Sequence, residues 1–255
     1  MKAEEYLNST WWLSRTELLL GEEGLQKLAS ANVLVIGLGG VGAYAAEMLC
    51  RAGIGKMTII DGDNIEPTNI NRQLPALTST IGIPKAEVLM ERFMNINPRL
   101  KLDARKLFVR DELTDEILES CKYDYVVDAI DSLSPKVNLV SKCIERGIPV
   151  ISSMGSGGKL DPSKIEVADI SRSYNCKLAK AMRKRLHRRG IRKGLKVVFS
   201  SEEIPDEAVF GYDCPDSGMT KSMVGTISFM PAIFGCFCAS VVIRDLLEKT
   251  DSEQI

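Results

Sequence analysis

The chain has 255 residues, with 33 Lys and Arg against 34 Asp and Glu, 45% hydrophobic residues and a single His. This length and composition are typical of a folded globular protein and exclude a generally disordered chain. A net charge of -1 excludes a globally basic nucleic-acid binder, although it allows a local basic patch. One His argues against a Ser-His-Asp triad and against a zinc site built from several histidines.

The seven cysteines show no C-x-x-C pair. Their odd number argues against a disulfide framework, and their spacing argues against a structural zinc site, so we expect a reducing, cytoplasmic location. The stretch 227–243 carries no charge and approaches the length of a membrane span. Because it contains Ser228, Pro231 and Gly235, we interpret it as a buried core helix and keep membrane association as the less favoured alternative.

The predicted elements alternate along the chain. A helix is expected over 22–30, followed by a buried strand over 33–36, a glycine-rich turn, a helix over 43–52 and a strand over 57–60. The further expected helices are 85–95, 112–121 and 134–146, and the further expected strands are 101–109, 125–130, 148–152, 164–170 and 195–200. This order predicts an α/β fold with a doubly wound, mostly parallel sheet, a Rossmann-like nucleotide-binding half and a mixed C-terminal extension, in which the last two strands are candidates for antiparallel pairing.

We find no internal repeat and no low-complexity linker, so we expect one domain over residues 1–255. Its expected parts are an N-terminal helical arm (1–30), a nucleotide-binding core (31–154) and a substrate-side extension (155–255). The extension contains a basic segment (172–196) and the apolar C-terminal helix.

The turn after the first strand reads Gly37-x-Gly39-x-x-Gly42, with a further glycine at position 40. Glycines at this spacing let the backbone approach a phosphate, and the following helix offers free N–H groups and the positive end of its dipole. Asp61 ends the second strand, where a carboxylate binds ribose hydroxyls. By themselves these features predict a nucleotide or dinucleotide site and favour NAD.

The residues that follow favour a nucleoside triphosphate instead. Asn69-Ile70-Asn71-Arg72-Gln73 supplies amides and a guanidinium, and Lys85 opens the next helix. Asp128 and Asp131 close a strand at the carboxyl edge of the sheet, where ligands bind. Arg and Lys neutralise β- and γ-phosphates, and an aspartate holds Mg2+, whereas an NAD enzyme requires neither.

Five sequence segments together resemble the ThiF/MoeB-like adenylating proteins, which are relatives of the ubiquitin-activating enzymes. They are GLGGVG at 37–42, IIDGD at 59–63, NINRQ at 69–73, the lysine at 85 and DAIDS at 128–132. The resemblance runs from about residue 15 to about residue 247. Within that superfamily, three segments are similar to the branch that dehydrates threonylcarbamoyladenosine in tRNA: RTELLLGEEGL at 15–25, GSGGKLDPSKIEVADIS at 155–171 and VVFSSE at 197–202.

The resemblance implies ATP and Mg2+ as cofactors and a homodimer as the assembly. The ATP-binding residues that it implies are Gly37, Gly39, Gly40, Gly42, Asp61, Asp63, Asn69, Arg72, Gln73 and Lys85. The catalytic residues that it implies are Arg72, Lys85, Asp131 and Arg15, with Asp131 on Mg2+ and Arg15 reaching into the neighbouring subunit's site. Whether a monovalent cation also binds stays open at this point.

The implied reaction is adenylation of a carboxylate. Attack of the threonyl carboxylate on the ATP α-phosphorus gives an acyl-adenylate, and fixed cations stabilise the charge that spreads over the phosphate oxygens. A carboxylate is already ionised at neutral pH, so no histidine base is required. The ureido group of the same modification then attacks the acyl carbon, closing a ring with net loss of water.

An activator of a ubiquitin-like or sulfur-carrier protein C-terminus is the main alternative. Such a protein would use Cys176 or Cys214. Whether a cysteine desulfurase or another sulfur-acceptor protein is a partner stays open for either function. The missing C-x-x-C pairs count against this alternative, because sulfur-carrier activators of the superfamily carry them.

The basic segment has no acidic residue between Asp169 and Glu202, while eleven Lys and Arg lie between Arg172 and Lys196. Neighbouring like charges repel each other on a solvated helix, so this pattern favours a polyanionic partner over a mobile, solubilising loop. We therefore expect tRNA phosphates to contact four arginines: Arg183, Arg185, Arg188 and Arg189. His187 is interpreted as a surface residue.

Overall fold

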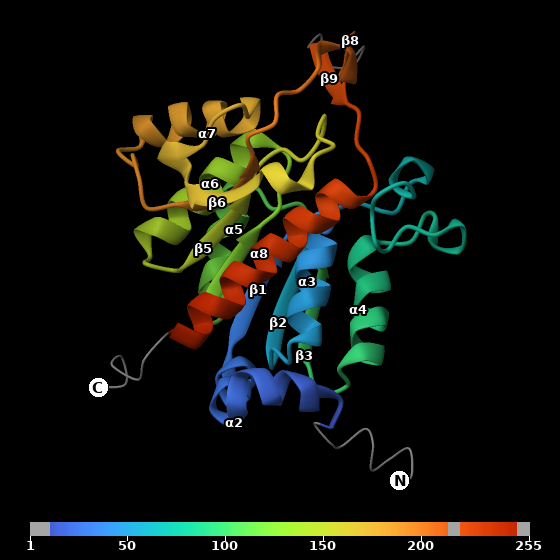
Figure 1. Ribbon diagram of the computed structural model, residues 1–255, viewed down its shortest axis with the longest axis vertical. Coiled ribbons are helices and arrows are strands. Elements are labelled where there is room, and N and C mark those ends of the chain that lie inside the picture. The colour runs from blue at the N-terminus through green and yellow to red at the C-terminus, as the bar shows by residue number, and fades with distance from the viewer. Residues whose placement is uncertain (1–10, 214–219, 249–255) are drawn as a thin grey trace.

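A seven-stranded sheet forms the centre of the computed structural model, which describes residues 11–213 and 220–248 (Figure 1). The strand order is β3-β2-β1-β4-β5-β7-β6, and β6 is antiparallel to β7, while the other neighbouring pairs are parallel. The strands are β1 (Asn32–Ile36), β2 (Lys56–Asp61), β3 (Lys101–Lys106), β4 (Tyr125–Asp128), β5 (Val150–Ser153), β6 (Ile165–Asp169) and β7 (Lys196–Ser200). The predicted doubly wound α/β fold, with its antiparallel final pair, is confirmed.

Helices cover both faces of this sheet (Figure 1). The α-helices are α2 (Ser14–Ser30), α3 (Gly42–Arg51), α4 (Lys85–Ile96), α5 (Asp111–Glu119), α6 (Leu133–Glu145), α7 (Lys177–Arg188) and α8 (Phe229–Glu248). Short 3-10 turns are η1 (Trp11–Leu13), η2 (Pro67–Asn69), η3 (Thr78–Thr80), η4 (Pro162–Lys164), η5 (Ile170–Arg172) and η6 (Asp206–Ala208). A separate hairpin pairs β8 (Val209–Asp213) with β9 (Thr220–Val224).

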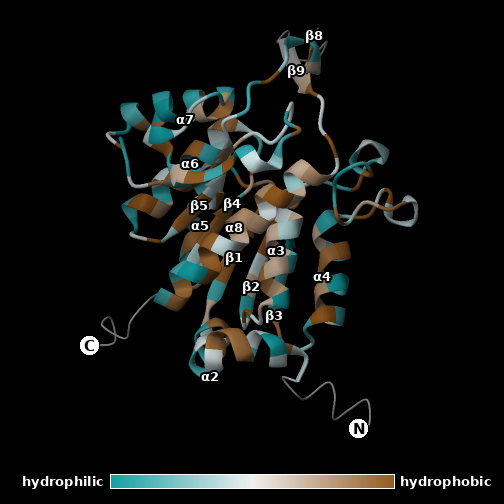
Figure 2. Cartoon of the chain, viewed as in Figure 1, coloured by the Kyte–Doolittle hydropathy of each residue, from teal (hydrophilic) through white to brown (hydrophobic). Residues whose placement is uncertain are grey.

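Strand β1 shows how the sheet divides the interior into two cores. Successive side chains of a strand point to opposite faces, and here both faces are buried, which explains the unbroken apolar run. Val33 and Val35 pack with α3, α4 and α8, whereas Leu34 and Ile36 pack with α5, α6 and α7. Hydrophobic residues accordingly concentrate on the strands and on the inner faces of the helices (Figure 2).

Two strands are shorter than the sequence predicts. β3 ends at Lys106 and β4 ends at Asp128, because their parallel neighbours β2 and β1 end at the paired positions Asp61 and Ile36. Residues 107–110 and 129–131 are thereby released as loops at the carboxyl edge of the sheet. These loops contribute to the site described below.

Three further elements differ from the prediction. The first helix begins at Ser14 rather than at residue 22, with a bend at Gly21, where φ is 73°. Helix α7 inside the basic segment and the β8–β9 hairpin were not predicted.

Helix α8 contains the uncharged C-terminal run. By length and composition alone this helix could cross a membrane, but half of its most apolar stretch is buried inside the protein. It packs closely on α3, since a Cβ at Gly235 would lie 2.4 Å from the carbonyl oxygen of Val41. Met230, Phe234 and Cys238 belong to the core, in agreement with the interpretation as a core helix.

Candidate active site

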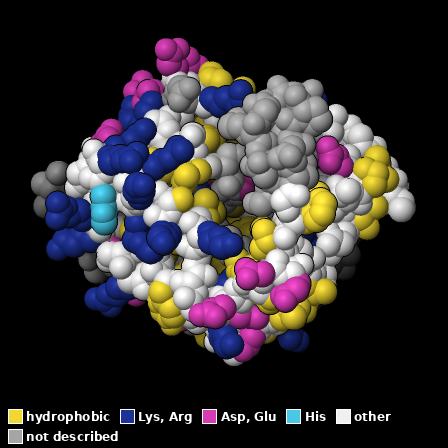
Figure 3. All heavy atoms as spheres, turned by 90° about the horizontal axis from the view of Figure 1, so that it is seen from above, with side chains coloured by type: hydrophobic (Ala, Val, Ile, Leu, Met, Phe, Trp, Pro, Cys, Tyr) yellow, Lys and Arg dark blue, Asp and Glu magenta, His cyan; other side chains and the backbone are white. Residues whose placement is uncertain are grey.

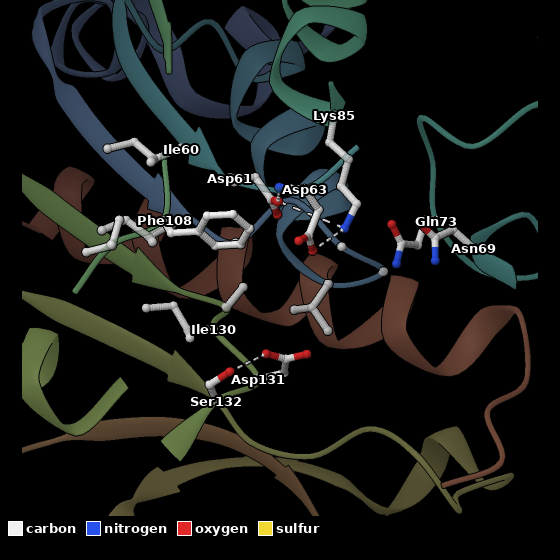
Figure 4. A pocket seen from close by; sticks show the side chains of 18 of the residues that line it. Ile60, Asp61, Asp63, Asn69, Gln73, Lys85, Phe108, Ile130, Asp131 and Ser132 are labelled. Atoms are coloured by element: carbon white, nitrogen blue, oxygen red, sulfur yellow. Dashed lines mark hydrogen bonds and ion pairs between the residues drawn. The ribbon is translucent and has the colours of Figure 1, made fainter. Parts of the chain in front are cut away.

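A cleft of about 620 Å³ opens at the carboxyl ends of β1, β2 and β4. Most of the predicted site residues line it: Gly37, Gly39, Gly40, Asp61, Asp63, Asn69, Arg72, Gln73, Lys85 and Asp131. Figure 4 shows Lys85 meeting Asp61 and Asp63, with Gln73 and Asn69 on one side and Phe108 and Ile130 on the other. Residues that lie far apart in the sequence thus share one cavity, as the strand order predicts.

The glycine-rich turn forms one wall of the cleft. Gly37 has a φ of 88°, and a Cβ there would lie 2.6 Å from the carbonyl oxygen of Ala129. A Cβ at Gly42 would lie 1.7 Å from the carbonyl oxygen of Gly37, so this position requires glycine for the turn itself. Gly39 differs, because its Cβ would meet only the Gln73 side chain at 3.7 Å. Helix α3 begins behind the turn with no side-chain cap, which is the arrangement that binds anions at helix N-termini.

Asp61 fixes the turn to the end of β2. Its two carboxylate oxygens accept hydrogen bonds from the backbone N–H of Leu38 at 2.6 Å and of Asp63 at 2.8 Å. Burial raises the pKa of Asp61 above its ordinary value, while the Lys85 ammonium opposes this rise. Lys85 Nζ lies 3.9 Å from the nearer oxygen of Asp61 and 3.0 Å from the carboxylate of Asp63. The buried lysine is therefore held between two acids on the cleft wall.

The loop after η2 supplies the amide and guanidinium groups. Arg72 Nη1 donates to the carbonyl oxygen of Thr68 at 3.0 Å and to Asn71 Oδ1 at 2.8 Å. Asn69 Oδ1 accepts from the backbone N–H of Glu66, which shapes the turn. Gln73 is buried, and within the described residues its Oε1 has no hydrogen-bond partner. An unsatisfied buried acceptor is costly, so Gln73 is suited to a ligand that donates a hydrogen bond.

The structure separates the two aspartates of the β4 edge. Asp131 lines the cleft and accepts a hydrogen bond from Ser132 Oγ at 3.1 Å. Asp128, which we expected at the cleft, lies instead in the core beneath it, completely buried. Its carboxylate forms an ion pair of 2.9 Å with Lys136, which is equally buried. β4 points this side chain into the interior because Asp128 still belongs to the strand, whereas Asp131 lies in the loop that follows.

An apolar wall beside Asp61 was not predicted from the sequence. It is formed by Ile60, Leu107, Phe108, Val109 and Ile130. The Phe108 ring lies against Gly62, where a Cβ would come within 2.4 Å of the ring, and it is 55% exposed. The Arg110 guanidinium lies 5.7 Å from the ring centroid. The sequence-based prediction missed this wall because it extended the strand to residue 109 and so placed Phe108 in the sheet.

The structure does not bring Arg15 to the cleft of its own chain. Arg15 is exposed on α2, which lies at the amino ends of the strands, at the opposite end of the sheet (Figure 1). Cys176 is buried, and its Sγ accepts a hydrogen bond from the backbone N–H of Ala179 at the start of α7. It does not line the cleft. Cys214 lies outside the described residues.

The four arginines proposed for tRNA differ in their surroundings. Arg183 is half-buried and donates to the carbonyl oxygens of Ser173 at 2.7 Å and Ile170 at 3.3 Å. Arg185 donates to Ser134 Oγ at 2.6 Å. Arg188 and Arg189 are exposed. His187, which precedes them, is exposed as well, in agreement with its interpretation as a surface residue.

Comparisons with known proteins find similar chains over almost the whole length. A "tRNA threonylcarbamoyladenosine dehydratase" from Bacillus subtilis is 38% identical over 247 residues, which cover 95% of this chain and 97% of the relative. The crystal structure of the Escherichia coli tRNA N6-threonylcarbamoyladenosine dehydratase TcdA in complex with ATP superposes with a TM-score of 0.82 at 35% identity, covering 94% of this chain and 96% of that one.

A sulfur-carrier activator is similar over a shorter stretch. The E. coli sulfur carrier protein ThiS adenylyltransferase is 34% identical over 142 residues, which cover 54% of this chain and 55% of that protein. The model of the ThiF family matches residues 13–255, nearly the whole chain. The chain therefore belongs to the ThiF family.

Proposed function

We propose that this protein is an ATP-dependent dehydratase of threonylcarbamoyladenosine in tRNA. The observation that carries the proposal is the single cleft that joins a glycine-rich phosphate turn, a ribose-binding carboxylate and two cations with Asp131. The similarity to dehydratases over nearly the full chain supports the choice of substrate. The cited ATP complex of a relative supports ATP as the nucleotide.

The chemistry follows from these groups. An oxygen of the threonyl carboxylate bonds to the ATP α-phosphorus, and the bond to the β-phosphate oxygen breaks, releasing pyrophosphate. Arg72 and Lys85 supply positive charge to the phosphate oxygens during this step, and the N-terminus of α3 supplies its dipole. A ureido atom of the same side chain then bonds to the acyl carbon while AMP leaves and the ureido group loses a proton. Ring closure within one bound substrate is favoured by effective molarity.

Asp131 fits a magnesium ion that is shared with the nucleotide. Among the described residues, no group of three or more His, Cys, Asp and Glu is arranged to hold a metal ion. Mg2+ characteristically uses one or two carboxylates together with substrate phosphates, and Asp131 offers one carboxylate on the cleft wall. A bound magnesium ion would neutralise charge on the phosphates.

A homodimer would complete the site with Arg15. Helix α2 presents Leu18 and Leu19, which are 89% and 81% exposed, close to Arg15 in the sequence. A second group of exposed apolar residues lies on the loop beside the cleft and on α4: Ile70, Leu77, Ile81, Ile83 and Met90. Exposed apolar patches of this kind mark protein interfaces. In a dimer with two-fold symmetry, each subunit buries the same patches against its partner. We propose that such a pair brings Arg15 of one subunit to the cleft of the other.

An activator of a carrier protein remains the second candidate, because the ThiS adenylyltransferase is similar in sequence over about half of this chain. The surroundings of Cys176 count against it. This thiol is 6% exposed and caps a helix, whereas a thiol that forms a thioester or receives sulfur from a partner must be reachable.

The deciding experiment incubates the purified protein with ATP, Mg2+ and tRNA that carries threonylcarbamoyladenosine, followed by digestion and mass spectrometry of the nucleosides. We expect an ATP-dependent loss of one water from the modified nucleoside, abolished in Arg72→Ala and Asp131→Ala. An unchanged nucleoside mass together with carrier-dependent ATP–pyrophosphate exchange would establish the second candidate instead.

A further inference from the structure

Helix α7 has two chemically opposite faces. Its inner face is apolar and buried through Ala179, Met182 and Leu186. Its outer face carries Lys177, Lys180, Lys184 and Arg188, all of them exposed, and we name these four residues the cationic face. Steps of three, four and four residues keep them on one side of the helix, about 16 Å from end to end.

The part of the chain that the structure describes provides no ion-pair partner for this face. Within the described residues, no carboxylate forms an ion pair with any of its four members. Cations four residues apart, such as Lys180, Lys184 and Arg188, repel each other and destabilise a helix. Lys177 also stands in the first turn, where the helix dipole disfavours a positive charge. This arrangement therefore stabilises neither the helix nor its packing, and it is suited to an anionic partner.

Two arginines outside the cationic face attach α7 to the rest of the protein. Arg183 bonds the carbonyl oxygens of Ile170 and Ser173 at the entrance to the helix. Arg185 bonds Ser134, and the flanking residues Ser132 and Pro135 line the cleft. These two arginines therefore position α7 at the edge of the active site. The cations of α7 that remain available to a ligand are those of the cationic face.

The basic surface lies beside the opening of the cleft. Figure 3 shows Lys and Arg gathered around the single His of the chain, His187 of α7, on one side of a central hollow. Exposed cations beyond the end of α7 extend this surface: Arg189, Arg192 and Lys193. A bound polyanion would thus run past the cleft in which the chemistry takes place.

We propose that the cationic face of α7 binds the sugar–phosphate backbone of the tRNA substrate, while Arg183 and Arg185 only position the helix. This inference rests on the proposed function and adds to it the surface that binds the tRNA. Phosphate contacts fix the register of a nucleic acid without reading its sequence, and structured RNA is recognised largely through its shape and backbone. A row of lysines and an arginine on a rigid helix supplies contacts of that kind.

The test compares two triple charge reversals. Lys180→Glu, Lys184→Glu and Arg188→Glu change the cationic face, and Lys56→Glu, Lys101→Glu and Lys122→Glu make the same change in net charge. The three control lysines are exposed at the amino ends of β2, β3 and β4, away from the cleft. Binding of tRNA is measured against salt concentration, and ATP binding is measured by calorimetry on the same preparations.

We expect the α7 variant to bind tRNA at least about tenfold more weakly, with a salt dependence shallower by about two to three in log–log slope, since each lost phosphate contact removes about 0.7 to 0.9. KM for tRNA rises, while kcat and ATP affinity stay at the wild-type values. The control variant keeps the wild-type tRNA affinity.

Equal tRNA affinity in the α7 and wild-type proteins would overturn the inference, as would equal losses in the two triple variants. A wild-type protein that binds vesicles of anionic phospholipid through these same residues, and tRNA without them, would assign the face to a membrane surface and also overturn it. Failure of the proposed function is distinguishable, because it appears as an unchanged nucleoside in the wild-type reaction.

Discussion

Lys136 and Asp128 form a completely buried ion pair of 2.9 Å directly beneath the loop that carries Asp131. Asp128 Oδ1 accepts from the backbone N–H of Ile130 at 3.1 Å, and Lys136 Nζ donates to the carbonyl oxygen of the same residue at 2.9 Å. Both polar groups of the residue before Asp131 are thereby fixed. Ser152 Oγ adds a hydrogen bond to the Asp128 carboxylate at 2.6 Å, so β5 supports the same loop.

Replacing Lys136 by Met leaves the carboxylate of Asp128 buried without its partner. We expect the free energy of unfolding to fall by about 3–5 kcal/mol, because an uncompensated buried charge is costly. Urea denaturation measures this change. Adding Asp128→Asn to the same protein should recover part of the loss, since the interior is then neutral. Arg105→Met, at an exposed ion pair with Asp103, should cost less than about 1 kcal/mol.

Gly39 and Gly42 should respond differently to alanine. Gly42→Ala forces a Cβ to within 1.7 Å of the Gly37 carbonyl oxygen, so we expect a large loss of thermal stability. Gly39→Ala meets only ordinary contact with Gln73, at 3.7 Å, and should fold normally. Its methyl group lies on the phosphate turn, so ATP affinity should fall by about tenfold or more. Wild-type ATP affinity in a folded Gly39→Ala protein would show that the ligand does not approach this turn closely.

Phe108→Ala should weaken ATP binding by about 1–3 kcal/mol, which corresponds to about fivefold to 150-fold, because an aromatic ring at this wall can stack on the base. Calorimetry with ATP measures the effect. Phe210→Ala is the matched control, since Phe210 is also exposed, at 68%, but does not line the cleft. If both variants bind ATP with equal, wild-type affinity, Phe108 has no contact with the nucleotide.

ATP affinity should depend on the ionisation of Asp61. Burial raises the pKa of this carboxyl above its ordinary value of 3.8, so its ionised form is lost at a higher pH than in an ordinary aspartate. Ribose hydroxyls donate to the ionised form, and affinity should therefore be constant near neutrality and fall as the pH drops through the raised pKa. The same shift means that ionised Asp61 destabilises the unliganded fold above that pH.

Titration of ATP binding from about pH 7.5 down to about pH 4.5 checks this dependence on Asp61. Asp61→Asn should bind ATP more weakly at neutral pH and show a flatter profile over the same range. A decline of the same size and midpoint in Asp61→Asn would assign the titration to another group.

If Arg15 of one subunit acts in the cleft of the other, two inactive variants should complement each other when mixed. Arg15→Ala and Asp131→Ala should each lack dehydratase activity when assayed alone. Subunit exchange in an equal mixture then creates mixed dimers with one intact cleft, giving about a quarter of the wild-type activity. A mixture that stays inactive although subunits exchange, as seen by tagged copies, would place Arg15 outside the partner's site.

The sequence predicted the alternating elements and most cleft residues because both depend on local signals. Apolar runs such as 33–36 mark buried parallel strands, and the glycine spacing at 37–42 marks the phosphate turn. Asp61 and Lys85 were correctly expected together, since parallel strands and the helices that follow them share one edge of the sheet.

The residues that were misplaced depend on where strands end. β4 stops at Asp128, so this aspartate faces the core and only Asp131 reaches the cleft. β3 stops at Lys106, which frees Phe108 for the cleft wall. Both ends are set by the length of a neighbouring strand, a long-range property that local patterns do not contain. The β8–β9 hairpin was also missed, and its paired residues Phe210 and Met223 are exposed apolar side chains that give no buried-strand signal.

The connection between β6 and β7 gives the basic helix an unusual independence. Asp169 pairs with Lys196, and the backbone N–H of Ile170 bonds the carbonyl oxygen of Leu195 at 2.8 Å. Everything from 171 to 194, including α7, is thus the loop of one hairpin whose two ends meet. The exposed charges of this excursion can change without disturbing the nucleotide cleft, because it is the apolar inner face of α7 that packs in the core. One catalytic frame can therefore acquire a different macromolecular substrate through a change confined to a single insertion.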